Sequence, residues 1–188
     1  MDQILDSELK QPDECITYGS FWQRCGAITL DTLIIGVPTF AISYYNITNW
    51  KSIPLLVLVS LAGMVYKPYC EFQYGATPGK KALNLNVVNQ RFDKADLTEI
   101  ILRNIFQIVF PLMTLAATIM VYNSPEFQDI NGFMEFGTLS STSSKATSYI
   151  TWMSSIVFII EFICLVSDQQ KRALHDRIGK TYVIVNAS

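Results

Sequence analysis

The chain has 188 residues, of which 50% are hydrophobic and 16% are charged. Soluble domains carry about 25% charged residues, so this composition argues against a soluble globular protein. The formal net charge is only -2 and the basic residues lie beside apolar segments, which argues against a nucleic-acid-binding surface.

The first twenty residues precede the first apolar segment. They begin with MDQILDSELKQPDE, which carries acidic residues where a secretory signal carries Lys or Arg, and no apolar core follows it directly. We therefore expect residues 1–20 to be a retained, cytoplasmic N-terminal segment. The four cysteines show neither CxxC nor His-paired spacing, so no metal site, redox motif or other cofactor is expected.

Four apolar segments are long enough to cross a bilayer, whose core of about 30 Å needs a helix of about 20 residues. They are residues 21–45, 53–72, 97–122 and 149–166. The short polar turn at residues 46–52 predicts an antiparallel hairpin of the first two helices. The long Ser/Thr-rich connection between the last two indicates a flexible loop. The predicted fold is an all-α integral membrane protein with a four-helix transmembrane bundle.

The distribution of Lys and Arg predicts the orientation of this bundle. With the N-terminus inside, only Lys51 and Lys145 fall in the outer loops. Because short basic loops stay in the cytoplasm, both termini are expected there. Trp22, Trp50 and Trp152 fall at predicted helix ends, where indole rings favour the lipid–water interface. We expect a multi-pass protein of a plasma membrane or bacterial inner membrane.

Two segments outside the spans have the composition of β-strands. In residues 83–87 apolar side chains alternate with Asn, and residues 181–185 are rich in β-formers. A two-stranded ribbon is marginal by itself, so the pair would have to pack on the helical bundle. A small cytoplasmic two-stranded element and two unpaired segments are the two alternatives.

Ionisable groups in a spanning helix cost about 2.5 to 3.5 kcal/mol at its centre, so they are expected to find partners. Arg24 and Asp31 lie seven residues apart, on one face of the first helix but too far apart for direct contact. We predict that Arg24 pairs with Asp176 and that Asp31 pairs with Arg103. A static pair at the membrane boundary needs no transport to explain it, so a structural role is the alternative.

Further charged residues accompany these pairs. Glu161 lies within an apolar run and must face the bundle or a cavity. Lys67 and Glu71, four residues apart, predict a helix-surface pair. Asp168 and His175 are candidate supporting residues in the loop after the fourth helix. Since no nucleophile accompanies His175, an enzyme is not expected.

Four sequence segments resemble the RDD family of small multi-spanning membrane proteins, named for one arginine and two aspartates. They are FWQRCGAITLD, GATPGKKALNLNVV, LRN and ALHDRIGKTYVIV. By this resemblance the three named residues are Arg24, Asp31 and Asp176, and residues 21–185 form an RDD-like transmembrane domain followed by a tail at residues 186–188. Lys81 stands where many members have Arg, and the Ser/Thr-rich outer loop is long.

The resemblance implies transport, because some members look like sodium/proton antiporters. The leading hypothesis is a small transporter or cation/proton exchanger. In it Asp31, with Glu161 as a second acid, exchanges a proton or cation at a site that Arg24 and Asp176 gate. Four helices enclose little volume, so the pathway is expected between protomers of a homo-oligomer. The alternative is a non-catalytic scaffold or accessory subunit whose Arg/Asp pairs are structural. The expected partners are the lipid bilayer and small cations or protons.

Overall fold

The computed structural model describes residues 16–143 and 145–185. Residues 1–15 of the predicted N-terminal segment and the predicted tail at residues 186–188 lie outside this part of the chain. The helices and strands are α1 (Phe21–Asp31), α2 (Val37–Tyr45), α3 (Ile53–Tyr74), α4 (Pro78–Ala82), β1 (Leu85–Asn89), α5 (Leu97–Arg103), α6 (Ile105–Tyr122), α7 (Phe133–Ser143), α8 (Lys145–Ser167), α9 (Leu174–Ile178) and β2 (Thr181–Val185).

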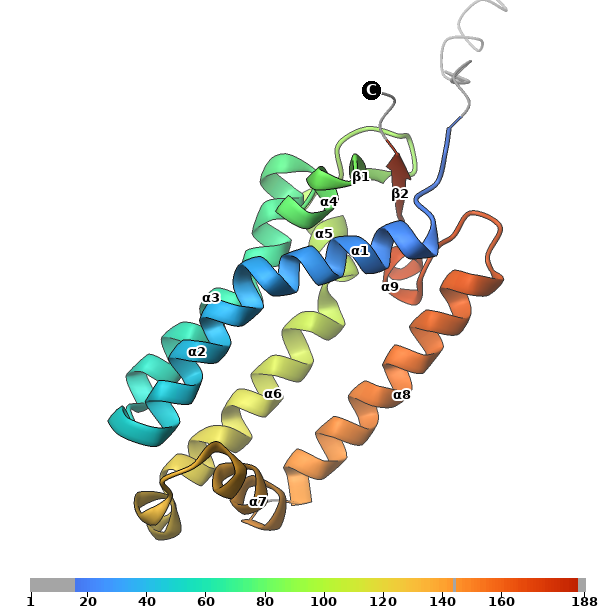
Figure 1. Ribbon diagram of the computed structural model, residues 1–188. Coiled ribbons are helices and arrows are strands. Elements are labelled where there is room, and N and C mark those ends of the chain that lie inside the picture. The colour runs from blue at the N-terminus through green and yellow to red at the C-terminus, as the bar shows by residue number, and fades with distance from the viewer. Residues whose placement is uncertain (1–15, 144, 186–188) are drawn as a thin grey trace, which may run out of the picture.

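Four helical segments are long and apolar enough to cross a membrane. They are Phe21–Trp50, Ile53–Tyr74, Ile105–Tyr122 and Lys145–Ser167. A π-helical turn at Thr32–Gly36 joins α1 and α2 into one continuous helix. Helix α6 lies between α3 and α8 (Figure 1). These segments confirm the predicted all-α membrane fold with four spans.

The polar turn predicted at residues 46–52 is shorter in the structure, because the first helix continues to Trp50. Asn46–Trp50 form a second π-helical turn, and Lys51 then reverses the chain with a φ of 49°. The Asn46 side chain supports the reversal, since its amide donates to the Ser52 carbonyl oxygen and its oxygen accepts from the Ser52 N–H, both at 2.9 Å. Amide side chains bond to nearby backbone in this way at chain reversals.

The third predicted span is divided. Helix α5 ends at Arg103, and Asn104, with a φ of -97° and a ψ of 13°, separates it from α6. The long apolar segment therefore begins at Ile105 rather than at residue 97. The break places Arg103 at the end of the span, where a buried guanidinium can meet partners from other segments.

The flexible loop predicted between the last two spans is wrong. A 3-10 turn at Pro125–Asp129 and helix α7 occupy much of it. Phe127 is fully buried and lies 4.2 Å from the ring of Tyr122, measured between ring centroids. Ile47 and Ile130 belong to the same apolar cluster. Burial of these side chains supplies the order that the Ser/Thr-rich composition of the segment did not reveal.

The two predicted strands pair as an antiparallel ribbon at one end of the bundle, which confirms the small β element. Leu85 lies opposite Val185, and Asn89 lies opposite Thr181. Strand β1 begins two residues later than predicted, because Asn84 adopts a φ of 54° after α4. Leu85 is buried in a core that includes Ala27, so the ribbon packs on α1 as a marginal sheet requires.

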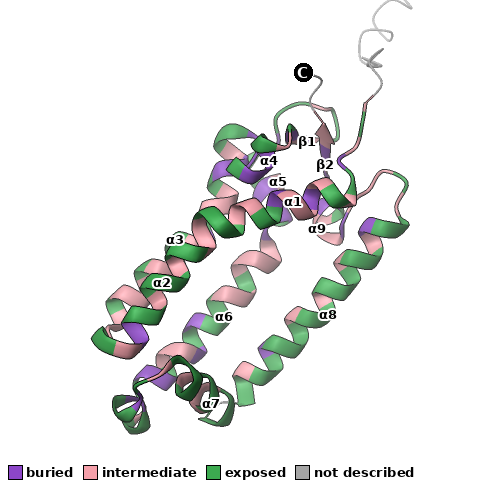
Figure 2. Cartoon of the chain, in the orientation of Figure 1, coloured by how far each residue is buried: buried purple, intermediate pink, exposed green. Residues whose placement is uncertain are grey.

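We call the end that carries β1, β2, α4 and α9 the sheet end and the opposite end the α7 end (Figure 1). Figure 2 shows buried residues gathered mainly at the sheet end, while the long helices keep broad exposed faces. Such faces suit helices that are solvated by lipid. Lys51 and Lys145 belong to the α7 end, so the charge distribution predicts a cytoplasmic sheet end, and this orientation stays a prediction.

Helix α4 touches α1 closely because of the sequence Thr-Pro-Gly. Thr77 caps α4 by accepting from the Lys80 N–H, and Pro78 begins the helix. A Cβ atom added at Gly79 would stand 2.2 Å from the carbonyl oxygen of Ala27. Only a residue without a side chain therefore allows this contact between the two helices.

We expect Gly79→Ala to destabilise the fold, because the added methyl group would overlap the backbone of α1. Overpacking of this kind costs about 1 to 3 kcal/mol. Thermal unfolding in detergent measures the effect. Gly137→Ala is the control, since a Cβ there meets nothing within 4 Å. Equal unfolding temperatures for the two variants would contradict the close packing.

Candidate functional site

Asp176 is the centre of a buried ion cluster at the sheet end. Its carboxylate is fully buried and lies 2.5 Å from Nη1 of Arg24, which confirms the predicted pair. Arg103 donates to the other carboxylate oxygen, and the Ala173 N–H donates at 3.1 Å. Burial alone would raise the pKa of Asp176, but Arg103, together with His175 and Arg24, holds that pKa well below its usual range.

Glu71 is the second carboxylate of the cluster. Its side chain is fully buried, forms an ion pair with Lys80, and lies 3.3 Å from Nε of Arg103. Asn104 donates to it at 2.9 Å. The predicted surface pair of Lys67 and Glu71 is therefore wrong, because the described partners of Glu71 come from α4 and α5. Burial lowers the pKa of Lys80 to about 8 against the attraction of Glu71, so Lys80 releases its proton more readily than an exposed lysine.

Arg103 connects the two carboxylates, since it contacts both Asp176 and Glu71. Burial opposes the charge of its guanidinium, but these two carboxylates together raise its pKa. Arg103 also donates to the Thr181 hydroxyl at 2.8 Å, which ties the cluster to β2. A Cβ added at Gly179 would lie 2.7 Å from Cβ of Arg103, so the chain before β2 packs directly on this arginine.

Asp31 does not meet Arg103, and that predicted pair is wrong. Its carboxylate instead accepts hydrogen bonds from the Thr77 hydroxyl at 2.6 Å, the Gly79 N–H at 2.8 Å and the Tyr66 hydroxyl at 3.2 Å. Arg103 is already committed to two other carboxylates, whereas α4 packs against this part of α1. Three neutral donors thus satisfy an acid near the membrane boundary.

Glu161 faces the bundle, as its place in an apolar run predicts. Its carboxylate lies 2.9 Å from Nδ1 of His175, and Nε2 of the same ring lies 3.3 Å from Asp176. Asp168 does not take part in these contacts and pairs with Arg172 at 3.1 Å. Burial works against it, but the hydrogen bond from Arg172 lowers the pKa of Asp168. His175 therefore links a half-buried acid on α8 to the buried cluster.

The cluster includes four residues that sequence analysis did not place there: Glu71, Lys80, Asn104 and Thr181. The turn at Gly75, with a φ of 72°, reverses the chain between Glu71 and Lys80, so no helical spacing connects them. The one sequence signal was the presence of Glu71 in an apolar helix. Within the part of the chain that the structure describes, no group of three or more His, Cys, Asp or Glu residues is arranged to hold a metal ion.

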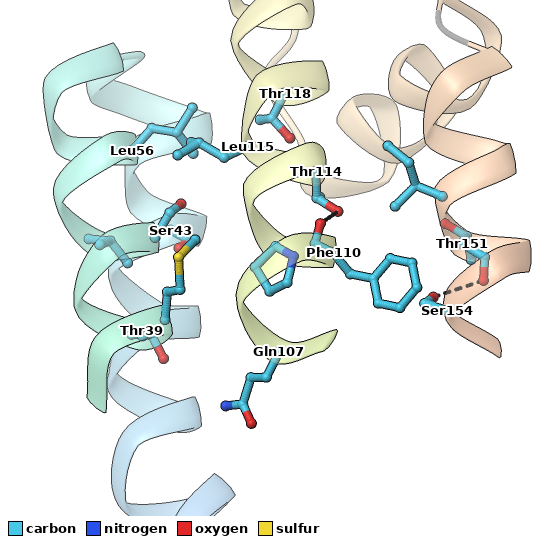
Figure 3. A pocket seen from close by; sticks show the side chains of 16 residues that line it. Thr39, Ser43, Leu56, Gln107, Phe110, Thr114, Leu115, Thr118, Thr151 and Ser154 are labelled. Carbon is cyan, nitrogen blue, oxygen red and sulfur yellow. Dashed lines mark hydrogen bonds between the residues drawn. The ribbon is translucent and has the colours of Figure 1, made fainter. Parts of the chain in front are cut away.

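A separate, partly open cavity of about 480 Å³ lies between α2, α3, α6 and α8. Figure 3 shows side chains of these helices around it, with Thr39 and Ser43 on one side and Thr151 and Ser154 on the other. Clefts that bind small molecules have volumes of about 300 to 1,000 Å³. The size of this cavity therefore suits a small solute.

The ion cluster lies about two helical turns from the cavity on α3 and α8, and about one turn from it at the start of α6. Met64 lines the cavity, and Glu71 follows it by seven residues on α3. Ser154 lines it, and Glu161 follows by seven residues on α8. Seven residues of helix rise by about 10 Å. The predicted site residues are thus grouped beyond the sheet-end side of the cavity, and they are not among its lining residues.

We expect Asp176→Asn to destabilise the fold by about 3 to 5 kcal/mol, because two buried guanidinium groups would lose their shared charge. Unfolding in detergent at pH 7 measures the loss, and Asp168→Asn at the partly exposed pair should lose much less. Because the folded pKa of Asp176 is depressed, its stabilisation is present above the ordinary pKa of 3.8 and declines only as the pH falls further. Equal losses for the two variants would argue against the cluster.

The comparisons with known proteins give a family match but no individual relative. No curated protein and no solved structure matches the chain. The sequence profile of the RDD family matches residues 18–180, which include all of the described ion cluster except Thr181. The match covers most of the chain, and within it Arg24 and Asp176 form the pair that joins α1 to α9. The chain therefore belongs to the RDD family.

Proposed function

We propose that this RDD family protein is a small membrane transporter whose solute site is the cavity between α2, α3, α6 and α8. The observation that carries the proposal is the cavity itself, which all four membrane-spanning segments line. Transporters commonly bind their solutes near the middle of the bilayer, between helices that rearrange. The site lies within one chain, so it does not require a second copy, although a homo-oligomer stays a prediction.

In this proposal the ion cluster keeps the sheet end of the protein closed. It joins α1, α3, α5, α9 and β2 through buried charges whose partners come from different segments. Breaking such a contact in a low-dielectric interior is costly, which makes an opening of the sheet end a discrete event rather than a fluctuation. Arg24, Asp31 and Asp176 are then positioning residues, and the protein is a transporter rather than an enzyme.

Accessibility of the cavity to water tests the proposal without knowledge of the solute. We expect Ser60→Cys, in a chain whose four native cysteines are replaced by alanine, to react with a membrane-impermeant thiol reagent from either side of a vesicle. Leu58→Cys on the same helix is the control, since Leu58 is 67% exposed and does not line the cavity. Its reaction is expected to be slow in lipid.

Reaction of Ser60→Cys from one side alone, or from neither side, would overturn the transport proposal. Either result would favour the scaffold or accessory-subunit alternative, in which the buried charges only fix the fold. Circular dichroism and the unfolding temperature of the alanine-substituted chain establish that it folds before labelling begins.

Proton or cation exchange at the sheet end is a second candidate function. The observation that favours it is the chain of contacts from Glu161 through His175 to Asp176, because a histidine between two carboxylates can pass a proton between its ring nitrogens. Glu161 and His175 are each about one fifth to one quarter exposed in their side chains, at 24% and 20%, whereas Asp176 is fully buried. This series of contacts thus leads from a partly exposed carboxylate to a fully buried one.

We expect Glu161→Gln to abolish cation-driven proton movement in proteoliposomes if this second function operates, because the first acceptor of the chain is removed. A pH-sensitive dye inside the vesicles measures the flux. Glu135→Gln at the α7 end is the control, since Glu135 is exposed and far from His175 in the fold (Figure 1). Unchanged flux in Glu161→Gln would eliminate the relay and leave the cavity proposal intact.

A further inference from the structure

The cavity between α2, α3, α6 and α8 has an uncharged lining in which polar side chains are set among apolar ones. Seven Ser or Thr hydroxyl groups and one Gln amide contribute to it, and none of the described lining residues is Asp, Glu, Lys, Arg or His. An unpaired ion in a membrane interior is costly, and nothing in this lining offers a countercharge. The lining therefore disfavours a cation, a carboxylate or a phosphate as the bound group.

Several hydroxyl groups in the wall already donate to carbonyl oxygens of their own helices. Thr114 donates to the Phe110 carbonyl oxygen, Thr151 to that of Thr147, and Ser154 to that of Thr151, each at 2.9 Å. A hydroxyl group that has given its one hydrogen still has lone pairs with which to accept. At these positions the wall presents acceptors, so a matching ligand brings hydrogen-bond donors to them.

Helix α6 adds an acceptor and a mixed group at the same wall. Pro111 has no N–H, so the carbonyl oxygen of Gln107, one turn earlier, receives no hydrogen bond from that position. The Gln107 side chain also lines the cavity, and its amide can both donate and accept (Figure 3). Leu56 on α3 and Leu115, farther along α6, supply apolar surface in the same cavity.

Gly63 leaves part of the space open. A Cβ atom built at this glycine, which lines the cavity, meets nothing within 4 Å. A larger side chain here can therefore enter the cavity without pressing on the surrounding helices. A substitution at Gly63 can therefore change the space in the cavity with little effect on the stability of the fold.

We propose that the cavity binds uncharged solutes with several hydroxyl groups, such as polyols. This ligand class rests on the proposed transport function, but binding of the solute can be measured without transport. Each hydroxyl of such a solute can donate to a Ser or Thr oxygen, while its C–H groups face the leucine side chains. Acidic and basic analogues of the same size lack the countercharge that they would need.

Protection of Ser60→Cys from a thiol reagent in detergent tests the binding. Glycerol, xylitol and sorbitol are the neutral probes, and gluconate and glucosamine are charged probes of sorbitol-like size. We expect at least one neutral probe to slow the labelling and neither charged probe to do so. Gly63→Leu, which adds a bulky side chain at the cavity wall, should weaken the protection, whereas Gly137→Leu on α7 should keep it.

Protection by a charged probe, or by none of the probes, would overturn the proposed ligand class; the second result would leave the cavity to a lipid chain. Swelling of proteoliposomes in sorbitol then measures flux. Protection without swelling supports the ligand class and contradicts transport, whereas labelling from both membrane sides without protection supports transport and contradicts the ligand class. Loss of protection in Gln107→Leu, with an unchanged unfolding temperature, would identify the amide as a ligand contact.

Discussion

The pairing of buried guanidinium groups with buried carboxylates is the constraint on which the sheet end depends. Asp176 accepts from Arg24 and Arg103, and Glu71 faces Arg103 and Lys80. None of these charges is tolerated alone in an interior of low dielectric, so each segment that supplies one must come to the others. Helices α1, α3, α5 and α9 are therefore held together by electrostatic need as much as by apolar contact.

Close backbone approach lets the short segments reach this cluster. Gly79 permits α4 to lie against α1, and Gly179 permits the chain before β2 to lie against Arg103. The position of α4 then delivers Lys80 to Glu71 and Thr77 to Asp31. Geometry thus explains the glycines of the Thr-Pro-Gly and Ile-Gly-Lys stretches in this chain, because a side chain at either glycine would push a charged partner away from its site.

The polar side chains inside the protein form two regions of different chemistry. Among the described residues, the buried charged groups lie at the sheet end, where partners of opposite sign surround them. The neighbouring cavity is lined by hydroxyl groups, an amide and apolar side chains. This separation argues that the charges of the RDD family residues set the shape of one end of the bundle, while a solute would meet neutral groups inside it.

The sequence by itself determined the membrane fold, because length and apolarity decide which helices lipid can solvate. It also predicted where the two strands lie, without deciding that they pair. It predicted the pairing of Arg24 with Asp176, since a costly charge had few partners of opposite sign. Only the tertiary structure decided that Arg103 serves Asp176 and Glu71 rather than Asp31, and that the segment before α8 contains α7. Those outcomes depend on chain reversals and close helix contacts between residues distant in sequence, which neither periodicity nor charge spacing encodes.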